Sequence, residues 1–119
     1  MASAVKRILS GSTDGKPVKI VATATAGTAL HTAVAGTTPG TYDEIWLWAY
    51  NSDTVARTLT IEFGGATAPD QNIVVSIPPK NGLQLIVPGL ILQNGATVKG
   101  FASAANVVTV SGFVNQITD

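Results

Sequence analysis

The residues that most often do chemistry in proteins are scarce in this chain. It has 119 residues, no cysteine and one histidine, His31. A thiol nucleophile, a Cys–His pair and a zinc site with several histidines therefore cannot be built within one chain. A Ser-His-Asp arrangement is arithmetically allowed, but the sequence has no G-x-S-x-G nucleophile elbow. Because His31 falls in a predicted strand on the face opposite Leu30, we expect a solvated or interface histidine.

Paired carboxylates are the next candidates, since glycoside hydrolysis uses two of them across a cleft. Asp43 and Glu44 are adjacent, and successive residues of a strand point to opposite faces, so these two cannot act together. Asp53 and Asp70 stand in turn-like contexts, where a short acceptor side chain helps to close the backbone. The sequence has no EF-hand loop, P-loop or dinucleotide fingerprint. We predict no catalytic, metal-binding or cofactor-binding residues, and a protein that is not an enzyme.

Aromatic side chains are better placed than titratable ones to form a functional surface. Residues 43–51, DEIWLWAYN, are apolar on both faces of an extended chain, whereas a sheet with one wet face alternates apolar with polar residues. One face carries Ile45, Leu47 and Ala49, and the other carries Trp46, Trp48 and Tyr50. Another part of the chain could cover these aromatic rings, or they could form a subunit or partner interface, or they could stack on carbohydrate. We take them as candidate interface residues.

The N-terminal stretch supplies a second candidate surface. Lys6 and Arg7 form the only basic doublet, and two charges give little affinity for nucleic acid at cellular salt. We expect them to pair with an acidic patch of a neighbouring protein or to be solvated. With their apolar neighbours Val5 and Ile8 they are candidate contacts to a partner, within an N-terminal arm that spans residues 1–12.

Two-residue periodicity dominates the chain, and helical spacing is nearly absent. Strands are predicted at residues 5–9, 18–25, 29–35, 43–51, 55–63, 72–77, 83–87, 90–93, 96–103 and 106–114. In the fifth of these, Val55 is expected on the core face with Leu59, Ile61 and Phe63. Short strands separated by Gly, Pro and Asn turns predict an all-β protein: a single domain, residues 1–119, folded as an antiparallel β-sandwich or jelly roll of about eight strands.

Composition narrows the choice of partners. Charged residues make up 12% of the chain, against about 25% in an ordinary soluble domain. Seven basic and seven acidic side chains cancel, and a small domain without net charge tends to associate. The balance argues against nucleic acid as a partner, since such domains usually carry a basic surplus. No apolar run approaches the ~20 residues of a spanning helix, so we expect no membrane association.

From about Ile20 to Val114 the sequence resembles small β-sandwich proteins of tailed-phage particles, of the capsid decoration (cement) or head-fibre kind. The matching stretches are GTALHTAVAGTTPGTYDEIWLWAYNSD, ARTLTIEFGG, NIVVSIPPKNGLQLIVPGLILQNGATVKGFAS and VVTVSGFVNQI. What these stretches have in common with the phage proteins is a succession of strands and turns, not a set of reactive residues. Trp46 and Trp48 depart from the small or polar residues that such proteins carry on the outer side of this strand.

The resemblance implies a non-enzymatic virion structural protein, a decoration or cement subunit that binds and stabilises the assembled capsid. It implies a homo-oligomer, a dimer or trimer, that contacts the major capsid protein on the capsid surface after synthesis in the host cytoplasm. Its N-terminal arm would add a strand to a neighbour's open sheet edge. Two alternatives stay open: a tail, neck or head-fibre component, and a carbohydrate-binding β-sandwich module that uses Trp46 and Trp48.

Overall fold

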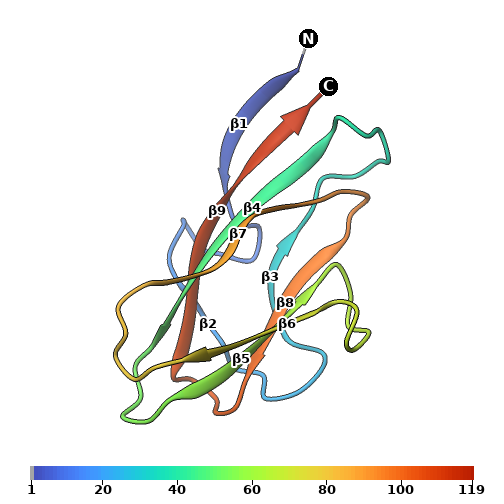
Figure 1. Ribbon diagram of the computed structural model, residues 1–119. Coiled ribbons are helices and arrows are strands. Elements are labelled where there is room, and N and C mark those ends of the chain that lie inside the picture. The colour runs from blue at the N-terminus through green and yellow to red at the C-terminus, as the bar shows by residue number, and fades with distance from the viewer. Residues whose placement is uncertain (1) are drawn as a thin grey trace.

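The computed structural model describes residues 2–119, and Met1 of the predicted arm lies outside the described residues. Nine strands form the fold, and this part of the chain has no helix that could cross a membrane (Figure 1). The strands are β1 (Ser3–Ile8), β2 (Val18–Lys19), β3 (Thr28–Thr32), β4 (Tyr42–Asn51), β5 (Arg57–Phe63), β6 (Asn72–Ile77), β7 (Gln84–Leu92), β8 (Thr97–Ala102) and β9 (Val108–Thr118).

The strands make two antiparallel sheets. The five-stranded sheet has the order β1-β9-β4-β7, with β2 also paired to β9, and the four-stranded sheet has the order β3-β8-β5-β6. From β2 onward, every connection passes from one sheet to the other except the β5–β6 connection. This is the connectivity of a double-sheet jelly roll. The predicted all-β sandwich is confirmed.

The core lies between the two sheets and explains why β4 alternates. Ile45, Leu47 and Ala49 are fully buried, and they face Leu59 and Ile61 of the other sheet within one apolar cluster. Burying each Leu or Ile side chain stabilises the fold by about 1.5–3 kcal/mol. The face of β4 that carries Ile45, Leu47 and Ala49 is therefore the core face, and the aromatic residues of β4 must point away from the core.

β1 and β2 share one edge of the five-stranded sheet. β1 pairs with β9 from Ser3 opposite Thr118 to Ile8 opposite Phe113, at the end of the sandwich where both termini lie (Figure 1). Residues 9–17 then leave the edge and lie against β3, and the chain returns to β9 at Val18. Much of the predicted arm is thus an edge strand of its own sheet. All six residues of β1 are exposed, and Leu9 is the first buried side chain.

Several predicted boundaries are wrong for identifiable reasons. The strand expected at 18–25 ends at Lys19, because the chain then crosses from β9 to the other sheet, where the Ala22 carbonyl accepts from the Ala102 N–H of β8. The Glu62 side chain then holds the following loop through Thr25 and Gly27. Residues 83–87 and 90–93 belong to one strand, β7, whose register shifts twice along β4. Pro88 is tolerated within it because β7 is an edge strand. Val55 precedes β5 and is exposed rather than on the core face.

Candidate interaction surface

The three aromatic residues of β4 lie on the outer face of the five-stranded sheet. The four-stranded sheet packs against the opposite face, so no strand within residues 2–119 covers Trp46, Trp48 or Tyr50. Each of the three is half-buried, which neighbouring side chains on the same face account for. The possibility that the other sheet covers these rings is therefore wrong.

Phe113 of β9 joins the two tryptophans in one cluster of rings. It lies directly opposite Trp46 in the β4–β9 pairing. The ring centroids are 6.3 Å apart for Trp46 and Trp48, 6.4 Å for Trp46 and Phe113, and 5.9 Å for Trp48 and Phe113, with interplanar angles of 20°, 17° and 28°. These spacings and near-parallel planes are typical of offset aromatic pairs, which add about 0.5–1.5 kcal/mol each beyond area burial.

Polar groups fix the orientation of this cluster. The Trp46 indole Nε1–H donates to Glu44 Oε1 at 2.7 Å, and Asn115 Nδ2 donates to the same oxygen at 3.1 Å. These two hydrogen bonds, that from Trp46 above all, hold the pKa of Glu44 below its usual value, because both favour the ionised carboxylate. Lys6 Nζ lies 4.5 Å from the centroid of the Phe113 ring, a cation–π contact. The indole N–H thus has a partner within its own chain.

A glycine on β7 makes room for the Trp46 indole. A Cβ atom added to Gly89 would lie 2.8 Å from Trp46 Cζ2, closer than carbon atoms pack. The φ angle of Gly89 is +79°, a region that residues with side chains rarely adopt. The indole therefore lies against the backbone of the neighbouring strand, and its position depends on the absence of a side chain there.

Exposed aliphatic residues extend the cluster to both edges of the sheet. Strand pairing places Ile8 of β1 opposite Phe113, Leu85 of β7 opposite Trp48, and Ile91 of β7 opposite Glu44. Their side chains are 54%, 46% and 54% exposed, respectively. We call this surface the aromatic face; it comprises Ile8, Trp46, Trp48, Tyr50, Leu85, Ile91 and Phe113, with Lys6, Glu44 and Asn115 beside them.

The seven predicted contact residues are divided between two sides of the sheet. Five of them, Lys6, Ile8, Trp46, Trp48 and Tyr50, lie on the aromatic face. Val5 and Arg7 point to the other side of β1, because they lie opposite Gln116 and Val114, whose partners on β4 face inward. Phe113, Leu85 and Ile91 were missed by the sequence analysis, because only the pairing of β9 and β7 with β4 brings them beside the tryptophans.

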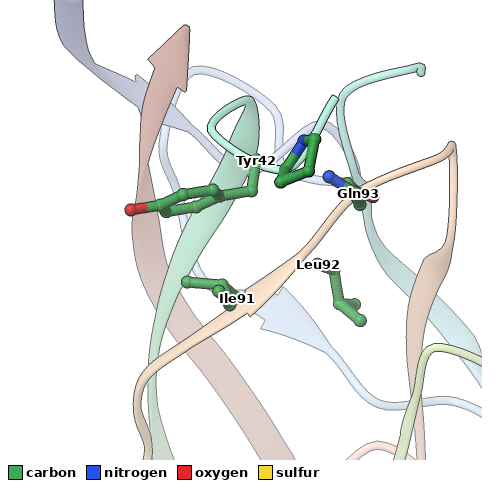
Figure 2. A pocket seen from close by; sticks show the side chains of 5 residues that line it. Tyr42, Ile91, Leu92 and Gln93 are labelled. Atoms are coloured by element: carbon green, nitrogen blue, oxygen red, sulfur yellow. The ribbon is translucent and has the colours of Figure 1, made fainter. Parts of the chain in front are cut away.

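An open pocket adjoins the aromatic face at the end of β4. Its volume is about 430 Å³, and it is lined by Pro39, Tyr42, Ile91, Leu92 and Gln93. Figure 2 shows the Tyr42 ring and the Ile91 side chain along one side of it. The Gln93 amide donates to the carbonyl oxygens of Thr38 and Thr41, both at 2.9 Å, so the loop that forms the rim is held in place. Ile91 belongs to both surfaces, so the pocket adjoins the aromatic face directly.

His31 is buried, 6% exposed, and the expectation of a solvated or interface histidine is wrong. The β3–β8 register shifts between Ala29 and His31, so Leu30 and His31 are both buried instead of alternating. His31 Nε2 lies 2.6 Å from Asp43 Oδ2, and the backbone N–H of Ser10 donates to Nδ1 at 3.0 Å. Asp43 is buried while Glu44 lies on the aromatic face, as their adjacency predicted.

Ser10, His31 and Asp43 do not form a catalytic triad in this arrangement. A triad serine presents its hydroxyl to the ring nitrogen that the acid does not bind. Here that nitrogen, Nδ1, accepts the backbone N–H of Ser10, and the Ser10 hydroxyl oxygen accepts the N–H of Thr32 at 2.7 Å. Neither ring nitrogen is free to take a proton from a hydroxyl, so the geometry gives His31 a structural role.

Comparisons of the chain with protein-family models, with curated proteins and with solved structures find no match. Across residues 2–119, no group of three acidic or histidine side chains is arranged to hold a metal ion.

Proposed function

We propose that the protein is a non-enzymatic structural subunit of a phage particle that binds and stabilises the assembled capsid through its aromatic face. The observation that carries the proposal is the cluster of Trp46, Trp48 and Phe113 on the outer face of a sheet whose core lies on its other side. Tryptophan is enriched among the residues that dominate binding energy in protein interfaces, because it buries a large rigid area.

The polar atoms around the cluster favour a protein partner. Removing an unpaired indole N–H from water costs free energy, but the Trp46 N–H already donates to Glu44. Covering Trp46 therefore requires no new hydrogen bond from the partner. The exposed aliphatic residues Ile8, Leu85 and Ile91 widen the surface that would be covered. The low charge content of the whole chain supports the same proposal.

The capsid as partner is supported by the resemblance of residues 20–114 and, by analogy alone, by a fold that viral capsid domains also use. A protein that binds only the assembled shell stabilises the shell in proportion to its occupancy. A dimer or trimer presents several identical contacts at once, and modest single contacts then give firm attachment. The major capsid protein is the proposed partner.

The test compares two single substitutions for particle binding. Trp48→Ala is expected to weaken attachment to purified capsids by about 30-fold or more, as loss of a residue worth ~2 kcal/mol would. Val74→Ala is the matched control, because Val74 is 62% exposed on the outer face of the four-stranded sheet. Equal attachment of both variants, or failure of the unaltered protein to bind capsids, would overturn the proposal.

The oligomeric state is tested separately by light scattering at micromolar concentration. We expect a dimer or trimer, and a stable monomer would count against a self-association role. Locating the protein on particles by electron microscopy separates the capsid surface from the alternatives of tail, neck or head fibre.

A carbohydrate-binding role is the second candidate, and the near-parallel planes of Trp46 and Trp48 favour it. Flat rings side by side can stack on sugar rings, and Glu44 and Asn115 supply polar atoms beside them. Binding to a glycan array that disappears in Trp48→Ala but persists in Val74→Ala would favour this role over capsid binding.

A further inference from the structure

The corner between β1 and β2 is closed onto the edge of β3 by three hydrogen bonds, each donated by a backbone N–H. The Ser10 N–H donates to His31 Nδ1 at 3.0 Å, the Thr32 N–H donates to the Ser10 hydroxyl at 2.7 Å, and the Gly11 N–H donates to the Leu30 carbonyl at 2.9 Å. Gly11 fits so closely that an added Cβ would lie 2.6 Å from the Ala29 carbonyl oxygen. His31, the one histidine of the sequence, thus joins this corner to β3.

The hydrogen bonds determine which protons His31 carries. Nδ1 accepts a backbone N–H, so it holds no proton, and the ring is neutral with its proton on Nε2. Nε2–H donates to Asp43 Oδ2, and the other carboxyl oxygen of Asp43 accepts from Gln116 Nε2 at 3.2 Å. Any second proton on the ring must therefore go to Nδ1, the atom that holds Ser10.

We propose that His31 is a proton-operated latch that holds the β1–β2 corner closed when it is neutral and releases it when it is charged. With a proton on Nδ1, two donors face each other at the position of the present hydrogen bond, and an attraction becomes a repulsion. Asp43 keeps its bond to Nε2, so the ring stays in place and the Ser10 peptide moves. Histidine is the side chain whose charge ordinarily changes between pH 5 and 8.

The groups around His31 are compatible with both the neutral and the charged ring. Asp43 on β4 is bonded to the ring, and Lys99 on β8 lines the same recess as Ser10 and His31. This recess, about 180 Å³, gives a displaced Ser10 peptide room to move. Arg7 of β1 and Asp14 and Lys16 of the corner segment are exposed and therefore well screened by solvent.

Opening the corner would loosen β1. No side chain of β1 is buried, so its position depends on its pairing with β9 and on the anchor that follows it. Segments with few buried contacts open most easily. That this would alter contacts made by Lys6 and Ile8 with a partner rests on the proposed function; the latch itself does not.

Nuclear magnetic resonance of the unaltered protein between pH 8 and pH 5 tests the latch. At pH 8 the imidazole nitrogen shifts should show the Nε2–H form. As the ring takes up its second proton, the Ser10 amide signal should move with the same midpoint. Its hydrogen-exchange protection, corrected for the intrinsic pH dependence, should fall about tenfold, as loss of a bond worth ~1.4 kcal/mol would give. The Val75 amide on β6 should keep its protection.

One variant sharpens the result. His31→Gln should abolish the pH dependence of Ser10 protection. A ring that takes up no proton down to pH 5, or one that does so while Ser10 protection stays constant, would overturn the latch. Neither result depends on capsid binding, so failure of the proposed function is separately visible.

Discussion

The two sheets of this sandwich present very different outer faces. On the four-stranded sheet, Thr58, Thr60, Glu62, Ser76 and Lys99 share the outer side with the exposed Val74 and the half-buried Phe101. On the five-stranded sheet the corresponding side carries the stacked rings of Trp46, Trp48 and Phe113 and the exposed Ile8, Leu85 and Ile91. The first face follows the usual alternation of a half-solvated antiparallel sheet, and the second does not.

The two faces also differ in what their side chains do for the fold. Polar residues of the four-stranded sheet serve the chain itself: Glu62 is 1% exposed and accepts hydrogen bonds from Thr25 Oγ1 at 2.5 Å and the Gly27 N–H at 2.6 Å. The rings of the five-stranded sheet hold no loop in place in this way. A face whose apolar residues neither fill the core nor anchor a loop is available for a partner. Substitutions on the two faces should therefore have opposite effects on stability and on association.

The largest effect on stability is expected from Glu62→Ala. It leaves the half-buried Gly27 N–H and the Thr25 hydroxyl without their acceptor, which should lower the free energy of unfolding by about 2–3 kcal/mol. Oligomeric state and particle attachment should not change at temperatures where the variant is folded. Thermal unfolding followed by circular dichroism measures the loss, and Thr58→Ala is a control on the same strand face. A loss of association as large as that of Trp48→Ala would remove the distinction between the faces.

The next largest loss of stability is expected from Gly89→Ala, which tests whether attachment depends on the position of the Trp46 ring. Alanine at a φ of +79° costs roughly 1–2 kcal/mol, and its Cβ must displace the Trp46 indole. Gly95→Ala is the matched control, since Gly95 has a φ of +66° and no atom within 4 Å of the added Cβ. Both variants should lose stability through backbone strain, but only Gly89→Ala should also disturb the Trp46 packing, change the near-ultraviolet circular dichroism of the tryptophans and weaken attachment. Identical spectra for the two would contradict the packing.

A smaller loss of stability is expected when Glu44 takes up a proton at low pH. Its pKa in the folded protein is held below the ordinary value of 4.5 by hydrogen bonds from Trp46 and Asn115. The stabilisation is therefore fully present above the unfolded-state pKa and is lost as the pH falls through the lower folded-state pKa. Tryptophan fluorescence should change over that acidic range in the unaltered protein but not in Glu44→Gln.

Asp53 provides a control for that titration. Its pKa is also lowered, first by the hydrogen bond from Arg57, but no tryptophan contacts it among the described hydrogen bonds. Asp53→Asn should leave the acidic fluorescence change intact. If Asp53→Asn removes the fluorescence change instead, the change reports a loosening of the whole fold at low pH and not the loss of the Glu44–Trp46 contact.

Local pattern predicted much of this fold, and long-range pairing accounts for most of what it missed. The alternation in β4 correctly separated Ile45, Leu47 and Ala49 from the aromatic residues, because side chains alternate in any strand. The same rule failed at His31, where a register shift turns two successive side chains inward. Phe113 and Gly89 were missed because their roles depend on which strands lie beside β4, which no spacing within one strand records.

The smallest loss of stability is expected from a substitution at Lys6, which tests whether β1 belongs to the aromatic face. Lys6→Gln removes the cation–π contact with Phe113, which at an exposed site is worth about 0.5–1 kcal/mol. Arg7→Gln removes the same charge from the next residue of the same edge strand, but on the side away from the rings. If β1 contributes to the aromatic face, chemical denaturation should show a loss for Lys6→Gln and almost none for Arg7→Gln. Equal losses would mean that the charge matters only to the strand edge, and that the aromatic face ends at β9.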